Sequence, residues 1–348
     1  MFESGHAQLR ESNGLSLDDV RAARQRIAPH VRRTALARNH TLSERFETNV
    51  YLKLEVFQKT GAFKVRGAFN KLLSLTEDQR RCGVVAVSGG NHAQAVAYAA
   101  RTLGMRALIL MPEFTPNNYV EATRGYGAEV VLTPTMAEAF RDVYTYEREG
   151  WVYIHPFADP LVIAGQGTIG LELLEDAPNI TDVILSIGGG GLAGGVATAM
   201  KALKPDVRIW GVETAGADSM AQALVAGRVV ELAAVTSIAR TLGAPAVSEA
   251  TLKLAQSHLE GVTVVSDREA LEALRFLLER LKVLTEPAAS CTLAALERLQ
   301  RRPGPDDHVA LILCGGNMSI DDLFQCELQT ARLPNLMAMN SAVEAAIP

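Results

Sequence analysis

Short apolar runs rich in β-branched residues alternate with longer amphipathic stretches along almost the whole chain. The apolar runs predict nine strands, at Val50–Leu54, Val84–Val87, Ala107–Met111, Glu129–Leu132, Val152–Ile154, Asp182–Ser186, Val207–Val212, Val262–Val265 and His308–Leu313. The stretches between them predict helices such as Asn91–Leu103, Pro134–Glu149, Leu192–Leu203 and Asp267–Lys282. Strands separated by such helices are typical of βαβ units. We therefore expect an α/β fold of mainly parallel sheets with helices on both faces.

The ends of the chain carry different signals. Ser16 followed by Asp19 resembles a capping box, and the helix that it begins should end at Pro29. The residues after about Leu333 lose their periodicity and are expected to form a frayed tail or a partner contact. No linker rich in Pro, Ser or Gly divides the chain, so we expect a second lobe to be inserted rather than appended.

Composition narrows the class of protein. The chain has 348 residues, 48% of them hydrophobic, and a net charge of −5. It has no apolar run near the ~20 residues of a membrane span, no signal-peptide pattern at its polar start, and no basic excess that indicates nucleic acid. The four cysteines Cys82, Cys291, Cys314 and Cys326 are scattered without the spacing of a metal site, so we expect reduced thiols. Together these features indicate a soluble, cytoplasmic protein.

Four glycine-bearing segments follow predicted strands or begin predicted helices. They are 59–64 (KTGAFK), 88–92 (SGGNH), 188–192 (GGGGL) and 314–317 (CGGN). Because ligands bind where the carboxyl ends of parallel strands meet, we expect these segments to line one crevice. The tetraglycine segment predicts a phosphate site at a helix start, since glycines let backbone amides approach an anion. It matches neither a Walker loop nor a dinucleotide fingerprint, and a tight structural turn is the alternative.

Lys64 is the candidate nucleophile. A lysine on a helix is usually a solvated surface charge, but the neighbours of Lys64 are small or apolar. Desolvation would lower its pKa and leave the amine free for Schiff-base chemistry. A phosphate cradle and an activated lysine together indicate pyridoxal phosphate (PLP).

The four segments, in this order and spacing, resemble the fold type II PLP enzymes of the threonine dehydratase and serine racemase group. The resemblance covers roughly residues 16–325. It implies a two-lobed architecture like that of the tryptophan synthase β-chain, with the cofactor between the lobes. Residues 1–80 and 158–330 would form the large domain, 81–157 the small inserted domain and 331–348 a tail. It also implies a homodimer.

The resemblance assigns roles to individual residues. Lys64 would hold the cofactor as a Schiff base, Phe63 would pack beside its ring, and Asn91 would bind the ring hydroxyl. Cys314 would face the pyridine nitrogen, where the group usually has serine, as a weak donor. The phosphate would bind to Gly188, Gly189, Gly190, Gly191 and Leu192. The substrate carboxylate would bind to Ser88, Gly89, Gly90, Asn91 and His92.

The implied reaction is β-elimination from a β-hydroxy-L-amino acid such as threonine or serine, which gives a 2-oxo acid and ammonia. Lys64 would remove the Cα proton, and the cofactor phosphate would assist loss of the hydroxyl. Racemases of the group carry a serine where this chain has Gly89, so we expect little racemisation. A serine racemase, a β-replacement enzyme like cysteine synthase and a non-catalytic phosphate- or nucleotide-binding protein are the alternatives.

Departures from the group pattern bear on the substrate. Ala62 replaces a serine, Tyr119 replaces a lysine, and Ser237–Gly243 replaces a segment that usually covers the ring. Arg240 in that segment is either a surface charge or a partner for an acidic or aromatic substrate. L-threo-phenylserine and L-threo-3-hydroxyaspartate are therefore alternative substrates.

A cation site is the last feature that the resemblance implies. Glu213, the carbonyl of Ala217 and Ser219 match its ligand positions. Oxygen ligands suit Mg²⁺, Ca²⁺ or K⁺, although the aspartate common at position 219 is missing. Without a cation, Glu213 would be a surface acid at the end of a strand. Glu286 matches a helix-start motif of the group and is also explained by ordinary compensation of the helix dipole.

Overall fold

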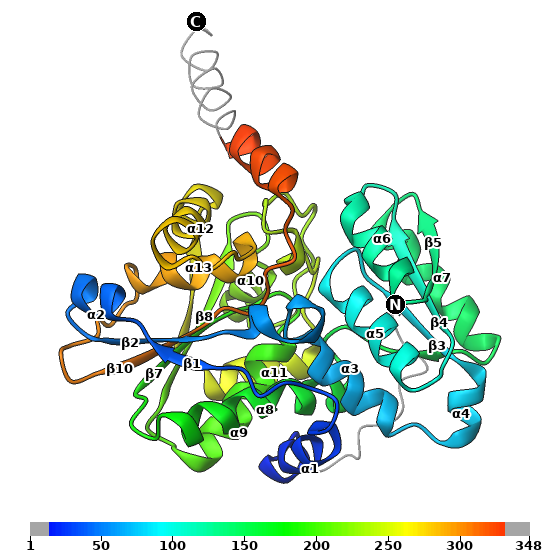
Figure 1. Cartoon of the computed structure of the whole chain (residues 1–348), viewed down its shortest axis with the longest axis horizontal. Helices are drawn as coiled ribbons and strands as arrows, with labels where there is room; N and C mark the ends of the chain where they lie inside the picture. The colour runs from blue at the N-terminus through cyan, green and yellow to red at the C-terminus, as the bar shows by residue number, and fades with distance from the viewer. Residues whose placement is uncertain (1–13, 331–348) are drawn as a thin grey trace, which may run out of the picture.

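The structure, a computed structural model, describes residues 14–330, and two separate sheets organise it (Figure 1). The larger sheet has six strands in the order β1-β2-β10-β7-β8-β9, and the smaller has four in the order β5-β4-β3-β6. The strands are β1 Leu36–Arg38, β2 Asn49–Lys53, β3 Val84–Val87, β4 Ala107–Pro112, β5 Glu129–Thr133, β6 Val152–Tyr153, β7 Asp182–Ser186, β8 Arg208–Thr214, β9 Gly261–Val265 and β10 His308–Ile312.

The helices alternate with these strands for most of the chain. They are α1 Leu17–Ile27, α2 His40–Phe46, α3 Lys64–Leu73, α4 Glu77–Cys82, α5 Asn91–Thr102, α6 Asn117–Gly125, α7 Met136–Arg148, α8 Pro160–Asp176, α9 Gly191–Leu203, α10 Ser219–Ala226, α11 Glu249–His258, α12 Asp267–Leu281 and α13 Pro287–Leu296. Short 3-10 turns form at η1 Glu55–Phe57, η2 Lys59–Gly61 and η3 Arg240–Leu242. The predicted α/β fold with parallel sheets is confirmed, with strand ends that differ by at most two residues.

Within residues 14–330, the one antiparallel pair of named strands joins β1 to β2, at the edge of the larger sheet. The sequence did not predict β1, because its three residues, Leu36, Ala37 and Arg38, form no apolar run. The predicted capping box at Ser16 is confirmed, and α1 ends at Ile27, just before Pro29. The helix predicted over Pro134–Glu149 begins only at Met136, because the side chain of Thr135 caps it.

Helices cover both faces of each sheet, which explains why the strands β3, β4 and β7 are buried along their whole length. In the smaller sheet, Val84 and Ala86 pack in the cluster that includes α5, whereas Val85 and Val87 pack against α7. In the larger sheet, α8, α9 and α11 lie on one side, and α12 and α13 lie on the other (Figure 1).

A buried network of charges anchors α3 within the larger unit. The Arg66 guanidinium forms paired hydrogen bonds with Glu55 at 2.8 and 2.9 Å and with Glu172 at 2.7 and 2.9 Å. Lys53 binds the same Glu172 at 2.6 Å. Arg66, Lys53 and Glu55 are fully buried, so two cations balance two carboxylates out of contact with water. Because Arg66 is two residues after Lys64 on α3, the network fixes the helix about half a turn beyond Lys64.

No helix within residues 14–330 is both long and apolar enough to cross a membrane. The four cysteines form no disulfide, and three of them, Cys291, Cys314 and Cys326, are buried. The predicted tail at 331–348 lies outside the described residues.

Candidate active site

Lys64 begins α3, directly after the buried Phe63. Its Nζ donates a hydrogen bond of 2.8 Å to the carbonyl of Pro156 and lies 5.3 Å from the centre of the Phe63 ring. Burial of the amine lowers the pKa of Lys64 to about 8, and the nearby Cys314 and Glu286 oppose that shift. The uncharged amine, which a nucleophile or a base requires, is therefore a larger fraction near neutral pH than for an ordinary lysine, and becomes the main form above about pH 8.

The tetraglycine segment joins β7 to α9. Gly190 has a φ of 90°, and a β-carbon there would lie 2.8 Å from Cβ of Thr251, so the position requires glycine. A β-carbon on Gly191 would lie 3.0 Å from the carbonyl of Phe157. The first N–H groups of α9 have no partner within the helix, and its dipole is positive at this end. The segment can therefore hold a phosphate against bare backbone.

A second helix start faces the site from the smaller sheet. The Ser88–His92 segment follows β3, and α5 begins at Asn91. Ser88 Oγ accepts a hydrogen bond of 3.1 Å from the N–H of Gly90. Burial lowers the pKa of His92 to about 3, and its Nε2 lies 2.9 Å from the carbonyl of Ile154. His92 is therefore neutral and fixed by the fold.

Glu286 is a buried carboxyl that our sequence reasoning explained only as helix-start chemistry. Its Oε1 accepts hydrogen bonds from Asn91 at 2.7 Å and from Thr241 at 2.9 Å. Burial raises the pKa of Glu286 to about 7, although these hydrogen bonds and Lys64 oppose the shift. Its Oε2 is buried without a hydrogen-bond partner among the described residues. In the sequence, the only indication that Glu286 belongs to the site is its place before a proline at a predicted helix start.

Cys314 follows β10 and is buried. Its Sγ lies 3.3 Å from Oγ of Ser186, the last residue of β7. Burial raises the pKa of the Cys314 thiol to about 12, so the thiol is protonated, and it donates weakly to the carbonyl of Ala288 at 3.7 Å.

The four predicted segments do meet. Asn317 donates hydrogen bonds to Asn91 Oδ1 at 2.8 Å and to the carbonyl of Thr60 at 2.6 Å. An isolated bridge pairs Ala62 with Gly315, and Lys64 interacts electrostatically with Cys314. Phe157 packs against Gly191 of the tetraglycine segment, and the preceding residue, Pro156, accepts the hydrogen bond from Lys64. Lys64 and the tetraglycine segment therefore lie near the same stretch of chain.

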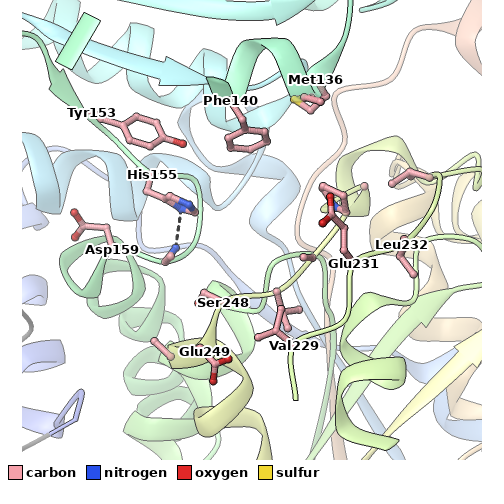
Figure 2. Close-up of a pocket in the computed structure, with 18 of the residues that line it drawn as sticks. Met136, Phe140, Tyr153, His155, Asp159, Val229, Glu231, Leu232, Ser248 and Glu249 are labelled. Carbon is pink, nitrogen blue, oxygen red and sulfur yellow. Dashed lines mark hydrogen bonds between the residues drawn. The ribbon is translucent and has the colours of Figure 1, made fainter. Parts of the chain in front are cut away.

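Two cavities adjoin this group of residues. A small one of about 40 Å³ is lined by Gly89, Tyr119, Arg240, Thr241 and Glu286, among others. A much larger one, about 2960 Å³, contains none of the segments described above and lies between α7, the strand β6 and the 228–250 segment (Figure 2). Figure 2 shows Phe140 and Tyr153 on one side and Val229 and Leu232 on the other. Arg240 lines both cavities, so it stands between the large cavity and the site.

The expected cation ligands are also close together, but Glu213 is not the surface acid of the alternative interpretation. It is fully buried, and its two oxygens accept hydrogen bonds from the N–H groups of Met220 and Ala221 at 2.9 and 2.8 Å. Burial raises the pKa of Glu213 to about 8. Ser219 Oγ is buried without a partner among the described residues, and Ala217 is buried beside it. Within residues 14–330, no three His, Cys, Asp or Glu side chains gather as a metal cluster.

Enzymes that bind a phosphorylated aldehyde cofactor through a lysine form the class that these features define. The features are a desolvated lysine, a glycine cradle at a helix start and a parallel α/β fold. The family described as pyridoxal-phosphate dependent enzyme matches residues 27–315, and the chain belongs to it.

Individual relatives agree with this assignment. The chain is 40% identical over 309 residues to the L-threonine ammonia-lyase of Thermotoga maritima, covering 88% of this chain and 77% of that protein. Among solved structures it is similar to maize serine racemase, with a TM-score of 0.85 and 36% identity over 93% of this chain and 100% of that chain. It is also similar to the threonine deaminase of T.th., with a TM-score of 0.82 and 42% identity over 88% of this chain and 99% of that chain.

The residues present fit PLP. A β-carbon at any of the four glycines, Gly188 to Gly191, would lie within 3.1 Å of another part of the chain, so the loop is bare backbone whose N–H groups are open to an anion. The Lys64 amine is desolvated, and the buried Glu286 Oε2 and His92 Nδ1 have no hydrogen-bond partner among the described residues. Lys64 and the tetraglycine segment would hold the cofactor at its two ends, and PLP would supply a sink for electrons from Cα of an amino acid.

Proposed function

We propose that this protein is a PLP-dependent ammonia-lyase that removes water and then ammonia from a β-hydroxy-L-amino acid. The observation that carries the proposal is the Lys64 amine, desolvated to a pKa of about 8 among the segments that fit the cofactor. The relatives named threonine ammonia-lyase and threonine deaminase support this reaction type.

Each residue of the site has a proposed task. Lys64 holds the cofactor and later takes the Cα proton, because burial lowers the pKa of its amine to about 8 and so favours the uncharged form. The backbone of Gly188–Leu192 binds the phosphate, and Phe63 packs against the ring. Ser88–His92 binds the substrate carboxylate at the start of α5. The protonated thiol of Cys314 donates weakly to the ring nitrogen, and Asn91 orients the ring hydroxyl.

Racemisation is a weak second candidate. The similarity to maize serine racemase favours it, but Gly89 has no side chain to return a proton to Cα. We therefore expect dehydration to exceed racemisation.

L-Threonine and L-serine are the proposed substrates, with L-threo-phenylserine and L-threo-3-hydroxyaspartate as alternatives. Arg240 is exposed, as expected of a surface charge, but it lines both cavities and forms no ion pair among the described residues, so it is available to a substrate of the alternative kind. A carboxylate or an aromatic ring on the β-carbon would offer it a partner. The side chain of Tyr119 donates a hydrogen bond to the carbonyl of Asn317, so it shapes the small cavity instead of binding a charge.

The decisive experiment measures 2-oxo acid release by the holoenzyme from these four amino acids, with and without Mg²⁺. Preference for threonine or serine would identify a general dehydratase. Preference for an aryl or acidic substrate, lost in Arg240→Ala, would assign specificity to Arg240. Absence of product from all four substrates, in protein that binds PLP, would refute the proposal and favour racemisation or β-replacement.

We also propose the remaining features of the expected organisation. The small domain would comprise 81–157 and the large domain 1–80 with 158–330, with the site between them. The protein would act in the cytoplasm as a homodimer, without a nucleic-acid or membrane partner. Analytical ultracentrifugation tests the dimer, because a monomer at micromolar concentration would contradict it.

A further inference from the structure

Thr115 carries a buried hydroxyl that the chain does not use. The residue lies between β4 and α6 and is 8% exposed. Its N–H donates a hydrogen bond of 2.9 Å to the carbonyl of Pro112, which fixes the loop. Its Oγ1, however, is buried without a hydrogen-bond partner among the described residues. Native proteins pair nearly all such groups, so a partner outside the chain is expected.

The position of this hydroxyl points to what the partner is. A β-carbon built on Gly89 would lie 2.7 Å from Thr115 Oγ1. The hydroxyl of Thr115 therefore lies against the position that a β-carbon at residue 89 would take, although it comes from a different loop. Gly89 and Pro116, which follows Thr115, both line the small cavity that Glu286 also borders. The hydroxyl is thus directed at the segment that precedes α5.

That segment favours an anion. The first N–H groups of α5 lack partners within the helix, and its N-terminal dipole is positive. A neutral hydroxyl beside such a place donates to an anion more strongly than to a neutral group. Thr123, a threonine of the same region, has no such task. Its hydroxyl, fully buried on α6, donates to the carbonyl of Tyr119 at 2.8 Å.

We propose that Thr115 is a substrate-binding residue whose hydroxyl, which lies beside Gly89, donates a hydrogen bond to the carboxylate of an amino acid bound at Ser88–His92. The inference rests on the proposed function for the identity of the ligand class. It adds a residue from a separate loop to the carboxylate site and explains why position 89 is glycine.

The first experiment measures binding of L-alanine, which lacks a β-leaving group, to the holoenzyme by titration calorimetry. Thr115→Val keeps the branched shape and removes the hydroxyl, so we expect the Kd to rise about tenfold or more. Thr115→Ser keeps the hydroxyl and should remain within about threefold of the original Kd. Thr123→Val is the matched control, because it removes a buried hydroxyl with an internal partner, and should leave the Kd unchanged. Unchanged binding in Thr115→Val, or no L-alanine binding by the unaltered holoenzyme, would overturn the proposal.

The second experiment tests the shared space and does not depend on activity. Gly89→Ser should lower the urea midpoint of unfolding, because its β-carbon meets Thr115 Oγ1. Thr115→Ala in the same chain should restore most of the midpoint. The double variant also moves the hydroxyl from one loop to the other, so its Kd for L-alanine should return toward the original value. An equal loss from Gly89→Ser in both backgrounds would contradict the contact.

Failure of the inference and failure of the proposed function give different results. If the holoenzyme binds L-alanine in a Thr115-dependent manner but releases no 2-oxo acid from any hydroxy amino acid, the proposed reaction is wrong and the binding role of Thr115 stands. If 2-oxo acid is released and Thr115→Val binds L-alanine normally, the reaction stands and the role of Thr115 is wrong.

Discussion

Replacement of Arg66 by methionine should destabilise the fold more than any change of an exposed ion pair. Arg66 is fully buried and makes paired hydrogen bonds with Glu55 and with Glu172. Methionine has a similar length and no charge. Two buried carboxylates would then have only Lys53 as a counter-charge, and one negative charge would remain uncompensated.

The magnitude follows from that imbalance. Removal of one partner from a buried ion pair costs about 3–5 kcal/mol of the free energy of unfolding. With a urea m-value of about 3 kcal/mol/M, the midpoint should fall by about 1–1.7 M. Arg66→Lys should also lower the midpoint, because an ammonium cannot form two paired sets of hydrogen bonds. Arg81→Met is the control, since Arg81 pairs with Asp78 on the exposed surface of α4.

The loss should also depend on pH. Burial alone would raise the pKa of Glu172, but Arg66 and Lys53 bring this pKa below its ordinary value of 4.5. In the unaltered protein this group contributes stability above pH 4.5, which is lost as the pH falls through the lowered pKa. Without Arg66, burial dominates and Glu172 binds a proton more readily on acidification. The gap in unfolding free energy between the two proteins should therefore narrow on acidification from about pH 7 to about pH 5, as urea unfolding followed by circular dichroism would measure. A loss comparable with that of Arg81→Met would refute the reasoning.

Three further predictions concern the site. Lys64→Ala should keep the fold by circular dichroism and abolish 2-oxo acid release; near-normal turnover would contradict the role of Lys64. Because burial lowers the pKa of Lys64 to about 8, the rate at which apoenzyme captures PLP should rise as the pH increases through about 8 and then level off; a rate independent of pH between about 6.5 and about 9.5 in stopped-flow absorbance would count against a desolvated amine. Mg²⁺, Ca²⁺ or K⁺ should raise the Tm of the protein and not that of Glu213→Ala; equal shifts in both proteins would place the cation elsewhere.

The sequence predicted those parts of the fold that depend on local pattern. Nine strands were found because each is an apolar run between turn signals, and their parallel order follows from the helices between them. The edge strand β1 has no such run. The tetraglycine segment and Lys64 could be identified because glycine runs and a lysine among apolar neighbours are visible without any tertiary contact.

The residues that sequence reasoning missed or misplaced are set by tertiary contacts. The alternative interpretation put Glu213 on the surface at the end of a strand, but the start of α10 folds back over it and its pKa rises to about 8. Thr115 acquires a role only from its distance to Gly89 on another loop. Nothing in the local sequence around either residue carries this information.

Glu286 shows why the site cannot be separated from the complete fold. Its Oε1 accepts from Asn91, which lies 195 residues earlier in the chain and belongs to the helix after β3 of the smaller sheet. Asn91 in turn accepts from Asn317, 226 residues away, just after β10 of the larger sheet. These hydrogen bonds join the two sheets at the Ser88–His92 segment. There, one oxygen of Glu286 has no hydrogen-bond partner among the described residues, and the pKa of Glu286 is about 7. A substrate that binds there changes the surroundings of a carboxyl poised between its charged and neutral forms, so substrate affinity and the contact between the sheets should depend on pH together.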